Sequence, residues 1–242
     1  MHGSKLNQFT PRALFTFFAV KRTLLALCLA LVAIFFSDTI FLRPLWLLVT
    51  ALHEASHGLA AVVLGGEITS FHVNFDAGGW CGYRMAPSFF KQLMVASAGY
   101  TGSLLIGGLL LVIAAATKKD RWVLAAFGLL LMYLSWLCLK SAGLFGTLFC
   151  AGTGLAFLGL ARAPLGQVHD FLLRTLALCC MFMAAWDVKD DLVDRTVEGS
   201  DGDVIAKMLH IPSLWVGVAW LVVSIVLLGL FLRWSAKVEK GV

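Results

Sequence analysis

The sequence predicts an all-α polytopic membrane protein with about six to seven transmembrane helices and a short β-hairpin. Of its 242 residues, 60% are hydrophobic and only 14% are charged, and the mean hydropathy is +0.88. Soluble domains carry about 25% charged residues, so this composition is typical of a membrane protein. Eight tryptophans fit anchoring at the membrane interface. The net charge of +5 is then explained by Lys and Arg that flank the spans, and no basic stripe indicates a nucleic-acid partner.

Seven apolar runs divide the chain, and a helix of about 20 apolar residues is long enough to cross the hydrocarbon core. The predicted spans are residues 14–36, 39–64, 92–116, 122–141, 143–161, 168–187 and 212–232. The first span is interrupted by Lys21-Arg22, which leaves the number of spans at six or seven. We expect a single membrane-embedded domain over residues 1–242, because no polar connection is long enough to fold alone.

The longest polar connection in the first half of the chain covers residues 67–90. Apolar and polar residues alternate between positions 71 and 76, which is the period of a half-buried strand. Ala77-Gly78-Gly79 then predicts a turn, and residues 80–84 a return strand. A plain connecting loop is the alternative. A hairpin here could hold an extended peptide by strand addition.

The span 92–116 carries a stripe of small residues. Gly99, Ser103 and Gly107 follow one another at intervals of four, so they share one face of a helix. Such a face allows close helix packing in a membrane, and we expect the helix at 39–64 to be its partner.

One apolar span contains ionisable residues at a spacing that indicates a metal site. The span 39–64 includes His53-Glu54-Ala55-Ser56-His57, the pattern H-E-x-x-H. Both imidazoles can reach one ion, because residues i and i+4 share a helix face. Glu54 lies about 100° further round the helix, where it can take a proton from a water at the metal. Ionisable groups in a span are costly, so we predict zinc ligands and a catalytic base rather than packing histidines.

A catalytic zinc takes three protein ligands and keeps one position open for water. The span 168–187 runs in the same direction as the span 39–64, so its end reaches the membrane face that the histidines approach. Asp187 closes that span after an apolar run, and a carboxylate in a membrane segment usually has a metal or charge partner. We therefore predict Asp187 as the third ligand. The alternatives are Asp190, Asp191 and His72.

Together these elements resemble the site-2 protease group of intramembrane zinc metalloproteases, in particular its compact peptidase-like branch. The matching elements are His53-Glu-Ala-Ser-His-Gly58, Ser97-Ala-Gly-Tyr-Thr-Gly-Ser103, and Asp187-Val-Lys-Asp-Asp191 followed by Arg195, Val197, Ser200 and Asp201. They spread over residues 50–210. The chain lacks the Asn-Pro and Leu-Asp-Gly that better-studied members carry at the third-ligand helix, and it has no PDZ-like insertion. The resemblance implies a zinc-dependent endopeptidase that hydrolyses peptide bonds of membrane proteins.

The expected cofactor is Zn²⁺, and the expected partners are the lipid bilayer and a membrane-protein substrate; the sequence does not define the oligomeric state. Two other classes of protein are open: a non-proteolytic scaffold with a structural metal, and a transporter that uses the His and Asp side chains as an ion or proton relay. Four basic residues near the N-terminus favour a cytosolic N-terminus and an active site near the cytosolic face. They are Lys5, Arg12, Lys21 and Arg22.

Overall fold

The computed structural model describes residues 23–32, 36, 39–190 and 197–239. This part of the chain is mostly helical and contains one two-stranded antiparallel sheet, which confirms the predicted fold class. Much of the predicted span 14–36 lies outside the described residues, and so does Asp191.

Six of the described helices are long and apolar enough to cross a membrane. They are α2 (Arg43–Val63), α3 (Phe89–Ala116), α4 (Asp120–Lys140), α5 (Leu144–Arg162), α6 (Gly166–Lys189) and α8 (Ser213–Glu239). Two shorter helices accompany them, the apolar helix Thr23–Val32 and α7 (Asp201–Leu209). We did not predict α7, because its nine residues mix apolar and charged side chains and contain no apolar run long enough to cross a membrane.

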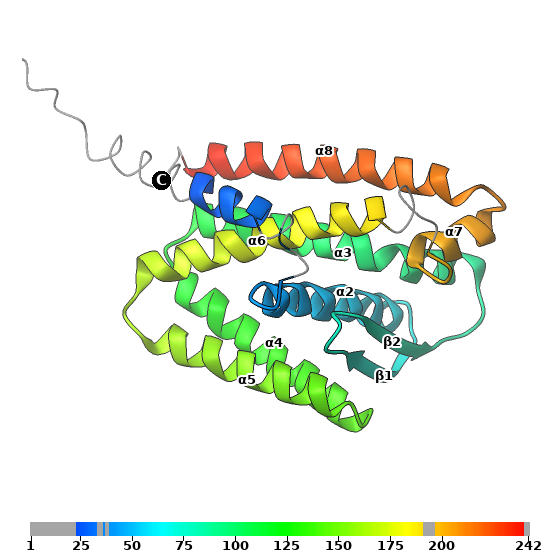
Figure 1. The fold of residues 1–242 in the computed structure, drawn as a ribbon, viewed down its shortest axis with the longest axis horizontal. Helices are drawn as coiled ribbons and strands as arrows, with labels where there is room; N and C mark the ends of the chain where they lie inside the picture. The colour runs from blue at the N-terminus through cyan, green and yellow to red at the C-terminus, as the bar shows by residue number, and fades with distance from the viewer. Residues whose placement is uncertain (1–22, 33–35, 37–38, 191–196, 240–242) are drawn as a thin grey trace, which may run out of the picture.

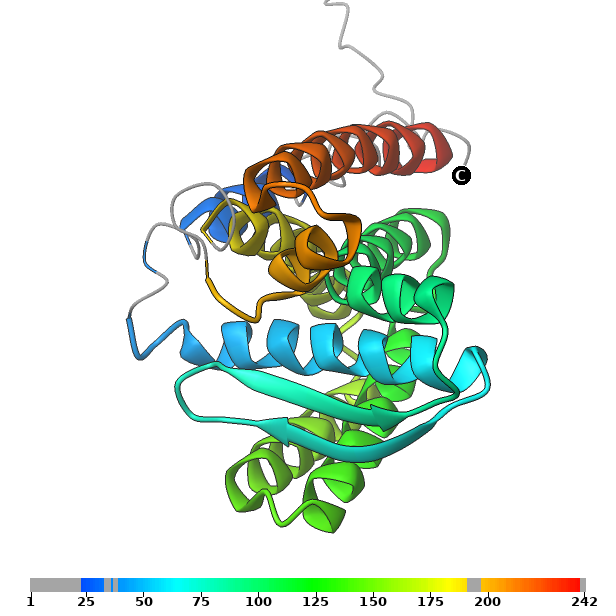
Figure 2. The same cartoon turned by 90° about the vertical axis from the view of Figure 1, so that its right-hand side faces the viewer.

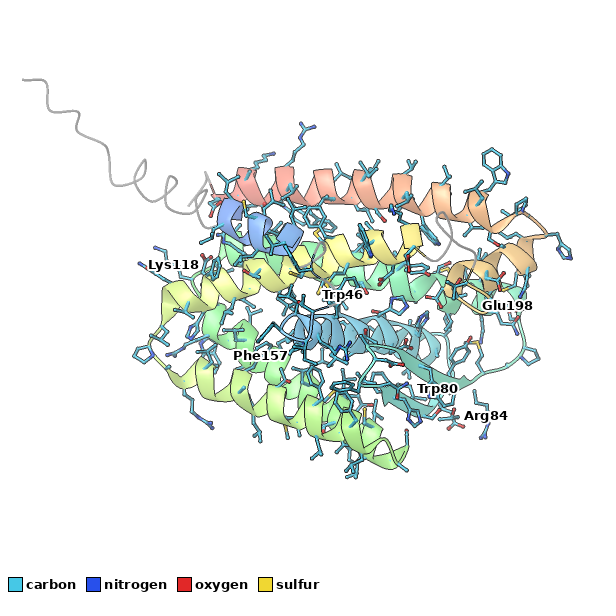
Figure 3. All side chains as sticks on the ribbon, in the orientation of Figure 1. Trp46, Trp80, Arg84, Lys118, Phe157 and Glu198 are labelled. Atoms are coloured by element: carbon cyan, nitrogen blue, oxygen red, sulfur yellow. The ribbon has the colours of Figure 1, made fainter. Side chains whose placement is uncertain are left out.

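Helix α3 is the centre of the arrangement, since it packs against α2, α6 and α8. In Figures 1 and 2, α8 lies along one side of the bundle, α2 runs through its middle, and α4 and α5 lie together on the opposite side. Figure 3 shows the charged side chains Lys118, Arg84 and Glu198 at the two ends of the bundle, whereas Phe157 and Trp46 lie between the ends. This distribution fits helices that cross a membrane along their length.

The small-residue stripe of α3 contacts two partners rather than one. A Cβ built on Gly107 would lie 2.6 Å from the carbonyl oxygen of Ala177 and 2.7 Å from Cγ of Met181, both on α6. Gly99, two turns earlier, faces His53 and His57 of α2. The expected packing against α2 therefore holds for Gly99, while Gly107 allows the close approach of α6.

The predicted hairpin is present. Strands β1 (Glu67–Val73) and β2 (Gly79–Arg84) pair antiparallel, with Phe71 opposite Cys81. Phe71 and Val73 are buried, as their alternation predicted. Strand β1 packs against α4 and α5, and both strands pack against α2. The hairpin therefore fills the space between α2 and the α4–α5 pair (Figure 2).

Two hydrogen bonds fix the hairpin in place. The hydroxyl of Thr50 on α2 donates to the carbonyl oxygen of Ala77 in the turn at 2.8 Å. The backbone N–H of Phe71 donates to the hydroxyl of Ser141, just after α4, also at 2.8 Å. The turn of the hairpin is thus fixed to the helix that carries the histidines.

The opposite end of the bundle is held by a buried ionic cluster. Arg174 of α6 forms ion pairs with Asp170 of the same helix at 2.9 Å and with Glu239 at the end of α8 at 2.7 Å. Its guanidinium also donates to the hydroxyl of Thr23 and to the carbonyl oxygen of Ala114. One side chain thereby joins α6, α8, α3 and the helix Thr23–Val32, and buried charges are tolerated because they are paired in this way.

Candidate metal centre

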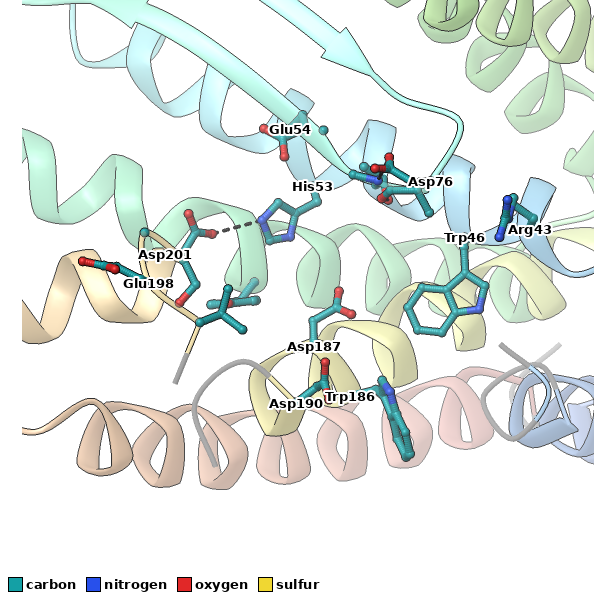
Figure 4. A pocket seen from close by; sticks show the side chains of 18 residues that line it. Arg43, Trp46, His53, Glu54, Asp76, Trp186, Asp187, Asp190, Glu198 and Asp201 are labelled. Atoms are coloured by element: carbon teal, nitrogen blue, oxygen red, sulfur yellow. Dashed lines mark hydrogen bonds and ion pairs between the residues drawn. The ribbon is translucent and has the colours of Figure 1, made fainter. Parts of the chain in front are cut away.

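Three side chains from two helices converge on one point. His53 and His57 project from α2, and Asp201 is the first residue of α7. Oδ2 of Asp201 lies 3.0 Å from Nε2 of His53 and 3.0 Å from Nε2 of His57. Figure 4 shows Asp201 reaching His53 from the start of α7. Ligands of a tetrahedral zinc, at bond lengths of 2.0–2.2 Å, are about 3.3–3.6 Å apart, so the three atoms need to separate only slightly to hold zinc.

The orientation of His57 is fixed by its other ring nitrogen. Nδ1 lies 2.7 Å from the carbonyl oxygen of Val95 on α3, and a carbonyl can only accept, so Nδ1 carries the proton. Nε2 is then the nitrogen that a metal ion would use in the neutral imidazole, and in the imidazolium form it donates to Oδ2 of Asp201. Metal-binding histidines usually make such a bond with the nitrogen that does not bind the metal.

His53 is held by ring packing. The Tyr100 ring of α3 lies edge-on to its imidazole, with 5.3 Å between the ring centroids. The two imidazoles are 5.0 Å apart in a similar edge-on arrangement. These contacts aim both Nε2 atoms at the same space.

The carboxylate of Asp201 supplies a negative charge to this space. Burial alone would raise its pKa, but hydrogen bonds with His53 and His57 hold the pKa at about 2. Asp201 is therefore ionised at physiological pH. Two imidazole nitrogens and one carboxylate form a donor set typical of zinc hydrolases.

Gly99 of α3 lets the three donor atoms converge. A Cβ built on Gly99 would have Nε2 of His53, Nε2 of His57 and Oδ2 of Asp201 as its nearest neighbours. Any side chain at position 99 would therefore crowd all three donor atoms and push them apart. The residues present therefore fit a zinc ion, and the fit depends on the missing side chain at position 99.

Glu54 lies beside this centre rather than in it. Its side chain is buried and packs under β2, because a Cβ on Gly79 would come within 2.9 Å of Glu54 Cγ. Cys81 of β2 lies close by, and burial together with the charge of Glu54 raises the pKa of its thiol to about 12. Cys81 is not a member of the cluster of His53, His57 and Asp201.

A polar cavity of about 670 Å³ opens beside the three side chains. Its walls come from α2, the turn of the hairpin, α3, the end of α6 and the segment that leads into α7. His53, Glu54 and Asp201 all line it. A peptide segment could therefore reach the metal centre and the carboxylate of Glu54 from the same space.

The structure brings together His53 and His57 as the spacing predicted, but the carboxylate beside them is that of Asp201. Asp187 lines the same cavity at the end of α6 and is not a member of the His-His-Asp cluster. In Figure 4, Asp187 and Asp201 approach His53 from different sides. Of the alternatives, Asp190 also lines the cavity, and His72 of β1 stacks on Trp80 with 5.1 Å between the ring centroids.

Asp201 was not among the ligands that we predicted, because its helix was not predicted. The prediction of Asp187 considered only the end of an apolar span, whereas the chain continues beyond α6 and returns to the histidines at α7. One local signal was available. Ser200-Asp-Gly-Asp203 has the spacing of a helix capping box, which predicts a helix start with Asp201 in its first turn.

The fold and the site define a membrane-embedded protein with a His-His-Asp group that can hold a metal ion. A family profile described as Peptidase M50B-like matches residues 24–231, which is most of the chain, and the protein therefore belongs to this family. No curated protein and no solved structure gives a significant match. Its six long apolar helices and its family make it a multi-pass membrane protein.

Gly99→Ala should abolish metal binding, because the added methyl group would crowd the three donor atoms and push them apart. Elemental analysis of the detergent-purified protein measures this, with a fall from about one zinc per chain to background expected. Gly152→Ala on α5 is the control, since its Cβ would meet nothing within 4 Å. Full zinc content in a folded Gly99→Ala variant would show that the ion binds elsewhere.

Proposed function

We propose that this protein is a zinc-dependent intramembrane endopeptidase whose zinc is bound by His53, His57 and Asp201. The observation that carries the proposal is the convergence of three donor atoms beside Gly99, in a chain of a peptidase family. A bound zinc would supply a Lewis acid and lower the pKa of a water molecule, the usual contribution of zinc to hydrolysis.

The number of ligands favours a catalytic site over a structural one. Among the described residues, the cluster has three members, and structural zinc sites almost always have four protein ligands. The cavity beside the cluster also gives water and a peptide a route to the fourth position. Both features support hydrolysis rather than the scaffold alternative.

Glu54 is the proton carrier in this proposal. It lines the cavity next to His53, one position along the helix, and so it can take a proton from the attacking water. The same carboxylic acid can then donate that proton to the leaving amine. Packing under Gly79 holds the side chain in one place, which favours both transfers.

The hairpin supports binding of an extended substrate. The N–H of Phe71 bonds to Ser141 and not across the sheet, so Phe71 and Cys81 form a non-hydrogen-bonded pair. The N–H and C=O of Cys81 therefore point away from β1, and the N–H donates a hydrogen bond to the carboxylate of Glu54. A peptide bond within a transmembrane helix is accessible only after local unwinding, and a strand edge can stabilise the unwound segment. The proposed substrates are therefore membrane proteins.

Asp187 takes a supporting role in this account. Its charge acts on His53, and it approaches the imidazole from a different side than Asp201. Carboxylates near a metal-binding histidine commonly stabilise its orientation without touching the metal. In this proposal Asp187 helps to orient His53, whereas Asp201 binds the metal.

Metal content of ligand variants tests this assignment. His57→Ala and Asp201→Asn should lose zinc, because each removes one of three donors, whereas Asp187→Asn should retain about one zinc per chain. Elemental analysis after purification gives the answer. Zinc lost in Asp187→Asn and kept in Asp201→Asn would reverse the two roles.

Glu54→Gln should keep zinc and lose turnover by at least about 100-fold, because the amide cannot accept the proton of the attacking water. The assay follows cleavage of reconstituted membrane-protein substrates. Glu67→Gln is the matched control, since this exposed carboxylate on β1 pairs with Arg84 and not with the site. Wild-type turnover in Glu54→Gln would remove Glu54 from the mechanism, and zinc without any cleavage in the wild type would favour the scaffold.

The position of Thr23 bears on the orientation expected from the basic N-terminus. Thr23 directly follows Lys21 and Arg22, and it accepts a hydrogen bond from Arg174 at the end of the bundle opposite the site. The positive-inside rule therefore favours a cytosolic location for that end and a site on the other membrane face, contrary to the expectation from the sequence.

A cysteine at Lys118, at the Arg174 end, should react with a membrane-impermeant maleimide only after cells are permeabilised (Figure 3). A cysteine at Glu198, whose side chain is 94% exposed beside the cavity, should react in intact cells. The unmodified chain provides the background, and the reverse pattern would place the site on the cytosolic face.

A further inference from the structure

The third ligand comes from a part of the chain that needs support to hold its position. His53 and His57 lie within a helix of 21 residues, whereas Asp201 opens a helix of nine residues between α6 and α8. A helix this short is marginal in isolation, because its few hydrogen bonds barely offset nucleation. The position of Asp201 therefore depends on contacts that stabilise the start of α7.

A reciprocal pair of hydrogen bonds closes the first turn of α7. Ser200 is the N-cap, and its hydroxyl accepts from the backbone N–H of Asp203 at 3.4 Å. In return, Oδ2 of Asp203 accepts from the backbone N–H of Gly199 at 2.8 Å. Gly199 has a φ of +81°, a conformation that favours glycine, so the backbone of this turn depends on the glycine. Asp201 lies inside the closed turn.

The carboxylate of Asp203 forms an ion pair with Lys207, one turn further along α7. Nζ of Lys207 lies 2.8 Å from Oδ2 of Asp203, four residues earlier on the same helix. Asp203 is only 5% exposed, whereas the side chain of Lys207 is 61% exposed. Lys207 thus covers a buried carboxylate that already carries the hydrogen bond from Gly199.

Apolar packing docks the same helix on the metal centre. Ile205 and Ala206 are buried against Ala96 and Tyr100 of α3 and against Val216 of α8. Tyr100 in turn packs edge-on to His53. The apolar side of α7 sets its distance from α3, and the capped first turn sets the direction of Asp201.

We propose that Asp203, held by Lys207, is a positioning residue of the metal centre: it fixes the Gly199-Ser200 turn so that the carboxylate of Asp201 meets His53 and His57. The inference rests on the proposed function only in that these three side chains bind zinc. Asp203 is not a member of the metal-binding cluster, and its effect passes through the backbone of residues 199–201.

Zinc affinity tests this role directly. Competition with a chelator gives the dissociation constant of the full-length protein in detergent, and the visible spectrum of the Co²⁺-loaded protein reports the coordination geometry. Asp203→Ala should weaken zinc binding by about 10-fold or more and alter the cobalt spectrum, since supporting residues around a ligand commonly contribute 10- to 100-fold. Lys207→Met should weaken it less, and Lys207→Arg should restore it.

Glu198→Gln is the matched control. Glu198 also lies near Lys207, at 3.8 Å, but it is exposed and contributes nothing to the closed turn. Its substitution should leave the zinc affinity and the cobalt spectrum unchanged.

Each contrary outcome has a separate meaning. Wild-type affinity and an unchanged spectrum in Asp203→Ala would overturn the positioning role while leaving the zinc site intact. A lower melting temperature of the metal-free protein with unchanged affinity would also overturn it, because the cap would then serve folding alone.

If Asp203→Ala does not fold, equal affinity in Lys207→Met and Lys207→Arg decides against the role. Absence of zinc from the wild type would contradict the proposed function itself.

Discussion

One carboxylate oxygen joins the parts of this protein that matter for its proposed chemistry. Oδ2 of Asp201 meets both histidines of α2 at 3.0 Å, and it arrives from a helix that follows three further membrane-spanning helices along the chain after α3. Its geometry therefore depends on how α2, α3 and α7 are held together. Asp201 is a half-buried acid that stays ionised because its partners are basic, and a metal ion in the same space would satisfy all three groups.

Helix α3 makes that arrangement possible because it has glycine at two contact positions. At Gly99 the missing Cβ lets the three donor atoms converge, and at Gly107 it allows the backbone of α6 to approach. The same helix holds His57 through the carbonyl oxygen of Val95. At the far end of the bundle, Arg174 joins α3, α6 and α8 by paired charges and hydrogen bonds. The helices are thus fixed at both ends, which keeps the site between α2, α3 and α7 in register.

Local patterns predicted the parts of the structure that are local. Apolar runs located the spanning helices, the alternation at Phe71 and Val73 located β1, and a four-residue spacing placed His53 and His57 on one helix face. The contact between His53 and Asp201 is long-range, since 148 residues separate the two. The direction and apolar composition of the span 168–187 led to Asp187, which lines the cavity. These two properties do not show that a later segment of the chain returns to the same cavity. Only the capping residues Ser200 and Asp203 marked the helix that does so.

The ligand set of the bound metal is the most direct measure of this account. X-ray absorption at the zinc edge, on the purified full-length protein, separates nitrogen and oxygen neighbours from sulfur and recognises imidazole by its outer-shell scattering. We expect two imidazoles and one carboxylate with bonds of about 2.0–2.2 Å, and a loss of this pattern in Asp201→Asn. A sulfur shell at about 2.3 Å, or a spectrum unchanged by Asp201→Asn, would contradict it.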